Sequence, residues 1–385
     1  MKVKYKKEIY GVPFNIPTNV GDEYKYVKEA FRNRYLAGGG YFTKKCQEWM
    51  RKKFSLNMSL LTHSCTGALD MSAILSDVED GDEVIMPSFT FVSTANAFVL
   101  RSATPVFVDI REDTLNIDEK LIENAITKKT KAIVVVHYAG VGCEMDAITK
   151  IAKKHNLILI EDNAQGFYAK YKNKYLGTFG DMSAISFHET KNLSSGEGGA
   201  LWINKQKYIE RAEIIWEKGT NRNKFYRGEI DKYTWVDVGS SFLPSELVSA
   251  CLWAQLKSAR EVTIKRINDW NLYYKGFEDL EKEGVLQRPN IPSYCEHNGH
   301  IFYILLENQK VRSKLIDYLK DNGILSVFHY IPLHSSPAGK KYCRINGNLP
   351  VTDDISIRLL RLPLYYGLRK YEIMRTIHMV KKFVK

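Results

Sequence analysis

Residues 131–162 read KAIVVVHYAGVGCEMDAITKIAKKHNLILIED, and this stretch decides the fold class. Two short apolar runs, KAIVVVHY and LILIED, flank a helix-like segment, MDAITKIAKKHN. Short apolar runs that alternate with helical segments are typical of βαβ units, in which the strands are parallel. Buried parallel strands are continuously apolar, as these two runs are. The stretch therefore predicts part of a mainly parallel sheet in an α/β protein.

The same alternation extends from about residue 58 to residue 218. The apolar runs SLLTH, DEVIMP and TPVFVDI are each followed by a helix-like segment, and DMSAISFHE and GALWIN add two strands. After residue 240 the pattern changes to one long or broken helix over residues 245–282, followed by a smaller α+β pattern. We expect a large α/β domain over residues 31–255 and a small C-terminal domain over residues 256–385, with residues 1–30 packed near the small domain.

Composition narrows the functional classes. The 385 residues are long enough for two or three domains, and the formal net charge is +12, spread along the whole chain. This charge is compatible with nucleic acid, a membrane surface or a small anionic ligand. No nucleic-acid recognition motif, secretory h-region or membrane-spanning run is visible, so we expect neither a nucleic-acid nor a membrane partner. The six cysteines include no C-x-x-C pair, which predicts reduced thiols, a cytoplasmic protein and no zinc site.

Polar residues follow several predicted strands, at the edge where an open α/β sheet binds its ligands. Cys65 and Thr66 start a helix, whose N-terminal N–H groups can bind phosphate, although Thr66 could serve only as a cap. Phe89 or Phe91 could present a flat face to a planar ring, or simply pack in the core. Asp162 could pair with a cationic ring nitrogen, or cap the next turn.

The stretch SFHETKNLSSGEGGALW, residues 186–202, adds an amine to this edge. It is not a P-loop, because Lys191 precedes the glycines and GALW reads as a strand. A lysine, an acidic partner and a phosphate cup are the parts that hold pyridoxal 5'-phosphate, the lysine as a Schiff base. Lys191, Asp162 and the Cys65–Thr66 turn therefore predict a site for this cofactor, and Gln165 follows Asp162 at a spacing that returns its amide to the same place.

The motifs PSFTFVSTANAF, HYAG, ILIEDNAQG, SFHETKN, GEGGAL and RLPLYYGL together resemble the DegT/DnrJ/EryC1/StrS sugar-nucleotide aminotransferases, over nearly the whole chain. The resemblance implies a fold-type-I, aspartate-aminotransferase-like architecture that uses pyridoxal 5'-phosphate. Longer stretches, such as GDEVIMPSFTFVSTANAFVLR and DKYTWVDVGSS, resemble the dTDP-4-amino-4,6-dideoxygalactose transaminases of that family. Those enzymes serve the biosynthesis of enterobacterial common antigen, lipopolysaccharide and related surface glycans.

Carried over by position, the resemblance implies a role for each site residue. Lys191 would form the Schiff base, with Asp162 on the pyridinium nitrogen, Gln165 beside it and Phe89 over the ring. The phosphate would be held by Cys65, Thr66 and Ser186. The family shares its active sites across a homodimer, and Ser241 stands where many members place an asparagine that contacts the neighbouring subunit's phosphate. His188, His329 and His334 match positions near the sugar nucleotide.

The implied reaction transfers the amino group of L-glutamate to dTDP-4-keto-6-deoxy-D-glucose through pyridoxamine phosphate. The products are dTDP-4-amino-4,6-dideoxy-D-galactose and 2-oxoglutarate. A 3-aminotransferase, or an enzyme acting on another nucleotide-linked keto-sugar, stays open. A pyridoxamine-dependent dehydratase is disfavoured, because such enzymes carry histidine where this chain has Lys191. A regulatory or sugar-binding protein on the same fold is the alternative from another class.

Overall fold

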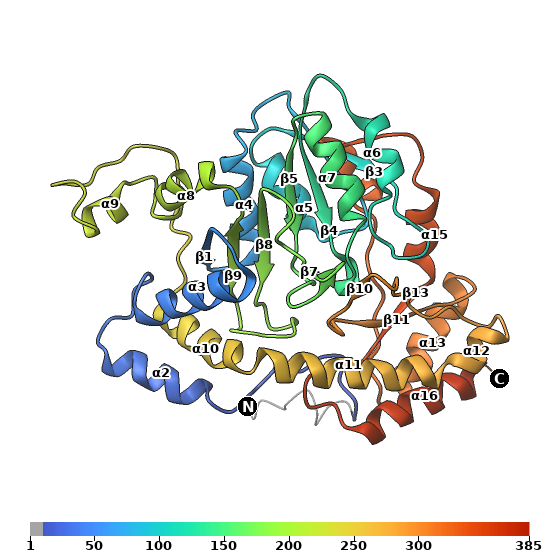
Figure 1. Ribbon diagram of the computed structural model, residues 1–385. Coiled ribbons are helices and arrows are strands. Elements are labelled where there is room, and N and C mark those ends of the chain that lie inside the picture. Colours follow the sequence, from blue (N-terminus) through green and yellow to red (C-terminus); the bar gives the residue numbers. More distant parts are fainter. Residues whose placement is uncertain (1–10, 385) are drawn as a thin grey trace.

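A computed structural model of the chain describes residues 11–384 (Figure 1). An eight-stranded sheet forms its centre, in the order β1-β9-β8-β5-β4-β2-β3-β12. β9 runs antiparallel to both of its neighbours, whereas the pairs from β8 to β12 are all parallel. The prediction of a mainly parallel sheet is therefore confirmed. The strands are β1 (Met58–Thr62), β2 (Glu83–Pro87), β3 (Thr104–Val108), β4 (Thr130–Val136), β5 (Ile158–Asp162), β8 (Met182–Ser186), β9 (Gly199–Ile203) and β12 (Arg344–Ile345).

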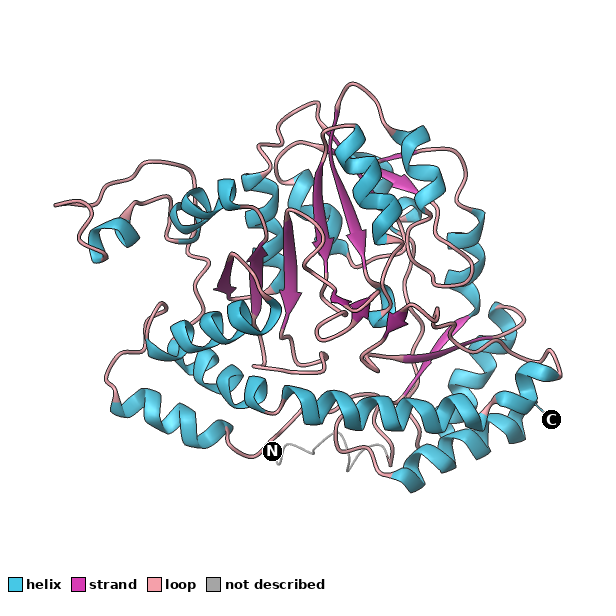
Figure 2. Ribbon diagram, viewed as in Figure 1, coloured by secondary structure: helices cyan, strands magenta, loops and turns pink. Residues whose placement is uncertain are grey.

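Helices cover both faces of this sheet, as Figure 2 shows. Strand β4 explains why: Val134 packs into one apolar cluster with α4 and α5, and its neighbour Val135 packs into another with α7. Successive side chains of a strand point to opposite faces, so a strand buried on both faces is apolar throughout. The helices of this part are α2 (Glu23–Arg32), α3 (Tyr41–Phe54), α4 (Cys65–Leu75), α5 (Val92–Val99), α6 (Glu119–Ala125), α7 (Met145–Lys154), α8 (Ile209–Trp216), α9 (Arg222–Tyr226) and α10 (Glu246–Lys257).

The C-terminal part has a separate apolar cluster, built by α11, α13 and α16 around a two-stranded sheet of β11 and β13. Its elements are α11 (Ala259–Gly276), α12 (Glu278–Lys282), β11 (Phe302–Leu305), α13 (Gln309–Asp321), α14 (Pro337–Tyr342), α15 (Pro350–Arg358), β13 (Leu359–Leu362) and α16 (Lys370–Val384). A third sheet joins β10 (Cys295–Glu296), β6 (Lys170–Tyr171) and β7 (Lys174–Tyr175). The predicted helix over residues 245–282 is thus broken into α10, α11 and α12.

Two details differ from the expected division at residue 255. Strand β12 lies in the C-terminal half of the chain but pairs with β3 at the edge of the large sheet. Helix α2 packs its Tyr26 and Ala30 against Ala250 and Ala254 of α10, rather than on the small domain. Val12, in contrast, packs in the C-terminal cluster, and residues 1–10 lie outside the described residues. We propose the break between α10 and α11 as the domain boundary, with α2 assigned to the large domain.

Among residues 11–384, no helix combines the length and the apolar content that a membrane span requires.

Candidate active site

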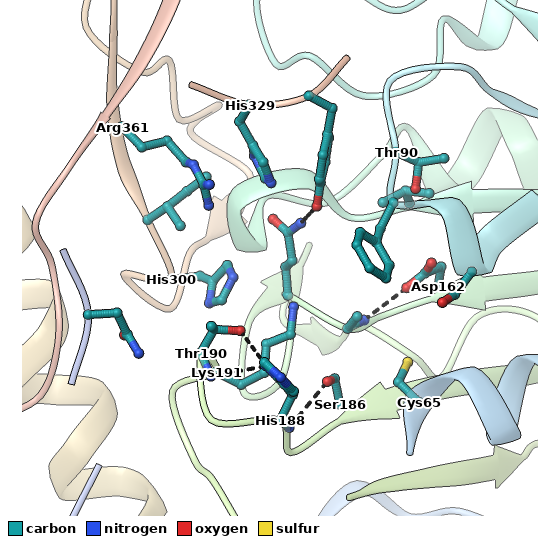
Figure 3. A pocket seen from close by; sticks show the side chains of 18 of the residues that line it. Cys65, Thr90, Asp162, Ser186, His188, Thr190, Lys191, His300, His329 and Arg361 are labelled. Atoms are coloured by element: carbon teal, nitrogen blue, oxygen red, sulfur yellow. Dashed lines mark hydrogen bonds between the residues drawn. The ribbon is translucent and has the colours of Figure 1, made fainter. Parts of the chain in front are cut away.

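A cavity of about 440 Å³ opens at the carboxyl ends of the central strands (Figure 3). Its walls include Thr66 after β1, Thr90 after β2, Val136 at the end of β4, Asp162 at the end of β5 and Ser186 at the end of β8. This is the edge where an open parallel sheet binds ligands. Eight of the residues predicted from the sequence line this one cavity: Cys65, Thr66, Asp162, Gln165, Ser186, His188, Lys191 and His329.

One end of the cavity is the start of α4. The Ser64 side chain caps this helix by accepting a hydrogen bond from the Gly67 N–H at 3.0 Å, and the hydroxyls of Thr66 and Ser93 lie 2.8 Å apart. Gly199 allows β9 to approach here, because a Cβ at this position would lie 2.5 Å from the backbone of Ser64 and Cys65. The free N–H groups and hydroxyls of a helix start are suited to bind phosphate.

Asp162 lies deeper, and it is 5% exposed. Its Oδ2 accepts a 2.7 Å hydrogen bond from the Thr94 hydroxyl, and its Oδ1 accepts one from the Ala164 N–H at 3.2 Å. Burial raises the pKa of Asp162, and the Thr94 hydrogen bond opposes this shift. A buried carboxylate held in place in this way can accept a hydrogen bond from a cationic ring nitrogen, and that pairing would offset its cost of burial.

Lys191 follows the end of β8, in a turn where its N–H donates to the His188 carbonyl at 2.9 Å. Its Nζ has no hydrogen-bond partner among residues 11–384, and its side chain reaches into the cavity. Burial lowers the pKa of Lys191, although the charge of Asp162 acts in the opposite direction. A neutral amine is the nucleophilic form of lysine, so this environment favours covalent attachment to an aldehyde.

Gln165 is held between two loops. Its Oε1 accepts from the Ala139 N–H at 2.7 Å, and its Nε2 donates to the Tyr330 hydroxyl at 3.1 Å. His329 lies beside it, with its Nδ1 2.9 Å from the Tyr138 hydroxyl. These contacts join the large domain to the loop at residues 329–330 and close one wall of the cavity (Figure 3).

The expectation that Phe89 covers the cofactor ring is wrong. Phe89 is 1% exposed and packs its ring against Tyr138 and Tyr330, at centroid distances of 5.1 and 5.6 Å, outside the cavity lining. Phe91 lies at the start of α5, lines the cavity and is 56% exposed. The two rings lie two residues apart, and the turn between β2 and α5 sends only the second one into the cavity.

Two other predicted residues lie outside this cavity. His334 binds the Ser88 hydroxyl at 2.7 Å and Asp353 at 3.1 Å, so it fastens its loop to the end of β2 and to α15 instead of lining the site. Ser241 is exposed. It forms an isolated antiparallel β-bridge with Glu217, and both residues lie in the segment that connects α8 to α10. An exposed residue away from its own site is compatible with a contact to a second subunit.

Sequence reasoning missed several lining residues: Phe14, Asn15, Thr90, Ser93, His300, Tyr330 and Arg361. Arg361 stands first in RLPLYYGL, one of the motifs that carried the family resemblance, whereas Phe14 stands in VPFN, near the start of the described residues. Nothing in their local spacing indicates that they meet Lys191, because they come from distant segments of the chain.

The cavity therefore fits pyridoxal 5'-phosphate. It has a helix start for a phosphate, a buried carboxylate that lacks a full counter-charge, and an amine without a hydrogen-bond partner in the described part of the chain. These are the protein groups that this cofactor requires.

Comparison with known proteins agrees with this fit. Residues 17–381 match the DegT/DnrJ/EryC1/StrS aminotransferase family. GDP-perosamine synthase of Escherichia coli O157:H7 is 29% identical over 97% of this chain and 98% of its own length. The Helicobacter pylori aminotransferase PseC, involved in pseudoaminic acid biosynthesis, has a TM-score of 0.89 and 26% identity over 97% of this chain and 99% of its own.

The sugar aminotransferase Spr1654 from Streptococcus pneumoniae has been solved in PLP and PMP forms, which superpose on this fold with TM-scores of 0.88 and 0.90. Both forms are 24% identical to this chain and cover 97% of it, and the chain covers 98% and 99% of theirs. The family uses pyridoxal 5'-phosphate as its cofactor. The fold, the cavity and the match over residues 17–381 lead to one conclusion: the chain belongs to the DegT/DnrJ/EryC1/StrS aminotransferase family.

Proposed function

We propose that this sugar aminotransferase transfers the amino group of L-glutamate to dTDP-4-keto-6-deoxy-D-glucose. The products are dTDP-4-amino-4,6-dideoxy-D-galactose and 2-oxoglutarate, for the biosynthesis of a surface polysaccharide. The observation that carries the transaminase chemistry is the meeting of Lys191 and Asp162 in one cavity with the start of α4. The choice of sugar is supported by the long stretches, such as residues 81–101, that resemble transaminases of this specificity.

Each residue of the site has a separate role in the proposed reaction. When bound, pyridoxal 5'-phosphate supplies an electron sink that allows an amino group to pass between an amino acid and a keto-sugar. Lys191 would hold the cofactor through its Nζ, and its amine, when free, would take a proton from the donor's amine-bearing carbon and deliver one to the sugar carbon. Asp162 would keep the ring nitrogen protonated. The start of α4, with Ser186, would bind the phosphate, and Phe91 would cover the ring.

The side of the sugar carbon on which Lys191 delivers the proton decides the configuration of the new amine.

We further propose that two chains share their active sites. Residues 217–241 form an arm that extends away from the body of the protein (Figure 1). The arm exposes several large side chains: Phe225, Tyr226, Tyr233 and Trp235. Exposed aromatic groups of this kind mark interaction surfaces. A second copy that covers the arm would bring Ser241 toward the neighbouring phosphate site, where its hydroxyl can donate one hydrogen bond.

The six cysteines are all unpaired in the structure, which supports a reducing compartment such as the cytoplasm.

A second candidate is the same reaction on another nucleotide-linked keto-sugar. The likeness to GDP-perosamine synthase supports a GDP-linked substrate as well as a dTDP-linked one. A regulatory or sugar-binding protein is disfavoured, since such a protein would not need an amine and a carboxylate joined in one cavity.

The test follows the absorbance band of the protein-bound cofactor. L-Glutamate should remove the band, and dTDP-4-keto-6-deoxyglucose should restore it, with the position of the new amine determined by NMR. If glutamate removes the band but only a GDP-linked keto-sugar restores it, the second candidate replaces the first. If the purified protein forms no such band with pyridoxal 5'-phosphate, the enzymatic proposal fails.

A further inference from the structure

Arg361 is a cation in the active-site wall that the reaction described above does not use. It belongs to β13 and reaches into the cavity (Figure 3). Its Nη2 donates to the Phe328 carbonyl at 3.2 Å, and its guanidinium lies 4.9 Å from the centre of the Phe14 ring. Its Nε is buried and has no hydrogen-bond partner within the part of the chain that the structure describes. No carboxylate among residues 11–384 forms an ion pair with it.

An arginine in this state is costly. Arg361 is half-buried, and partial removal of a charge from water without a counter-ion is unfavourable, so such charges are normally paired. Burial lowers the pKa of Arg361, yet a guanidinium stays protonated. Its planar fork matches the two oxygens of a carboxylate or phosphate. The wall of the cavity at Arg361 is therefore complementary to an anion.

Arg361 is the group of this wall that can bind an anion, because the neighbouring histidines carry no charge. Burial lowers the pKa of His300 and of His329, so both imidazoles are neutral there. Figure 3 shows Arg361 across the cavity from Cys65 and Ser186, the residues proposed to hold the cofactor's phosphate, so a different anion is expected at Arg361. Its positive charge also reaches Lys191, whose pKa it helps to lower.

We propose that Arg361 binds a carboxylate of the amino donor and so selects an acidic amino acid as the source of nitrogen. This inference rests on the proposed function. Two anions enter the site during that reaction: the donor's carboxylates and the diphosphate of the sugar nucleotide. The α-carboxylate is attached to the carbon that carries the reacting amine, so it must lie close to Lys191. The diphosphate is separated from the reacting keto carbon by the sugar ring. Arg361 lines the same cavity as Lys191, and its charge acts on that amine, which favours the carboxylate.

The direct test measures binding without turnover. The protein loaded with pyridoxal 5'-phosphate is titrated calorimetrically with glutarate, which has both carboxylates but no amine, and separately with inorganic pyrophosphate. Arg361→Gln should weaken glutarate binding at least about tenfold, because a charge-assisted pair is lost, and should leave pyrophosphate binding unchanged. Arg361→Lys, which keeps the charge but not the fork, should give an intermediate affinity.

Arg312→Gln is the matched control. Arg312 is also half-buried, its Nε also lacks a partner and its Nη1 also donates to a carbonyl, that of Ser356, at 3.2 Å, but it lies outside this cavity. The Arg312→Gln variant should bind glutarate with the affinity of the unmodified protein. The inference is overturned if the unmodified protein does not bind glutarate. It is also overturned if the Arg361→Gln variant binds glutarate equally well. Loss of pyrophosphate binding alone assigns Arg361 to the sugar nucleotide and also overturns it.

Following the two halves of the reaction separates this inference from the function on which it rests. Arg361→Gln should raise the KM for glutamate in the first half and leave the keto-sugar half unchanged, since the sugar carries no carboxylate. If the unmodified protein converts neither substrate, the proposed function fails, while the glutarate titration still decides the role of Arg361. Melting temperatures of both variants establish folding, and Arg361→Lys provides the test if Arg361→Gln is unstable.

Discussion

Gly199→Ala tests whether the start of α4 is part of the cofactor site. Gly199 is the first residue of β9 and pairs with Thr62 on one side and Ser186 on the other. A Cβ there would lie 2.5 Å from Cys65 N and from Ser64 C, which is 0.9 Å short of the 3.4 Å at which ordinary contact begins. These are backbone atoms and cannot rotate away. The added methyl group must therefore push the helix start away from the strand.

The size of the effect follows from this overlap. Forcing one extra carbon into a packed site costs about 1–3 kcal/mol. If the helix start moves to relieve the overlap, returning it to the position that binds the cofactor costs the same amount, about 1–3 kcal/mol. The affinity for pyridoxal 5'-phosphate should therefore fall about five- to 150-fold. The measurement is a cofactor titration followed by absorbance, with circular dichroism to show that the fold is retained.

Gly198→Ala is the control for this experiment. Its added Cβ would lie 2.4 Å from Ser195 Oγ, a terminal hydroxyl that can rotate, and 3.5 Å from Phe187 Cβ. The neighbouring substitution therefore adds the same group without moving backbone, and its cofactor affinity should be close to that of the unmodified protein. Equal affinities for the two variants would refute the reasoning, because the helix start would then not contact the cofactor.

Four further substitutions test individual side chains. Burial raises the pKa of Asp162, so its ionised form destabilises the cofactor-free fold above that pKa. Asp162→Asn should therefore raise the melting temperature of the cofactor-free protein at pH 7, and the gain should shrink as the pH falls; a gain that grows in acid would contradict this. Phe89→Ala should cost about 3–5 kcal/mol in the free energy of unfolding, because it empties a packed core. Phe91→Ala should change that energy by less than about 0.5 kcal/mol but weaken the cofactor, as denaturation and titration together would show. Lys191→Ala should abolish turnover in a folded protein, and measurable transamination by this variant would remove Lys191 from its catalytic role.

The parts of the site predicted correctly in position are those that follow strands directly. Asp162, Ser186 and Lys191 were placed together because the carboxyl ends of parallel strands meet at one edge of the sheet. The same rule explains the failure at Phe89. The rule identifies the turn after β2, but the direction of each side chain in that turn depends on packing against Tyr138 and Tyr330, which belong to other segments.

The sequence by itself determined the fold class and the strand ends, since apolar runs of strand length between helical segments reflect burial on both faces of the sheet. It also determined the chemistry, since a lysine, a carboxylate and a helix start are local features. Only the tertiary structure decided which distant residues complete the cavity. Phe14 and Arg361 stand at opposite ends of the chain, and they meet because Val12 and β13 pack in the same C-terminal cluster. Spacing along the chain carries no record of such a contact, because the packing of the whole cluster creates it.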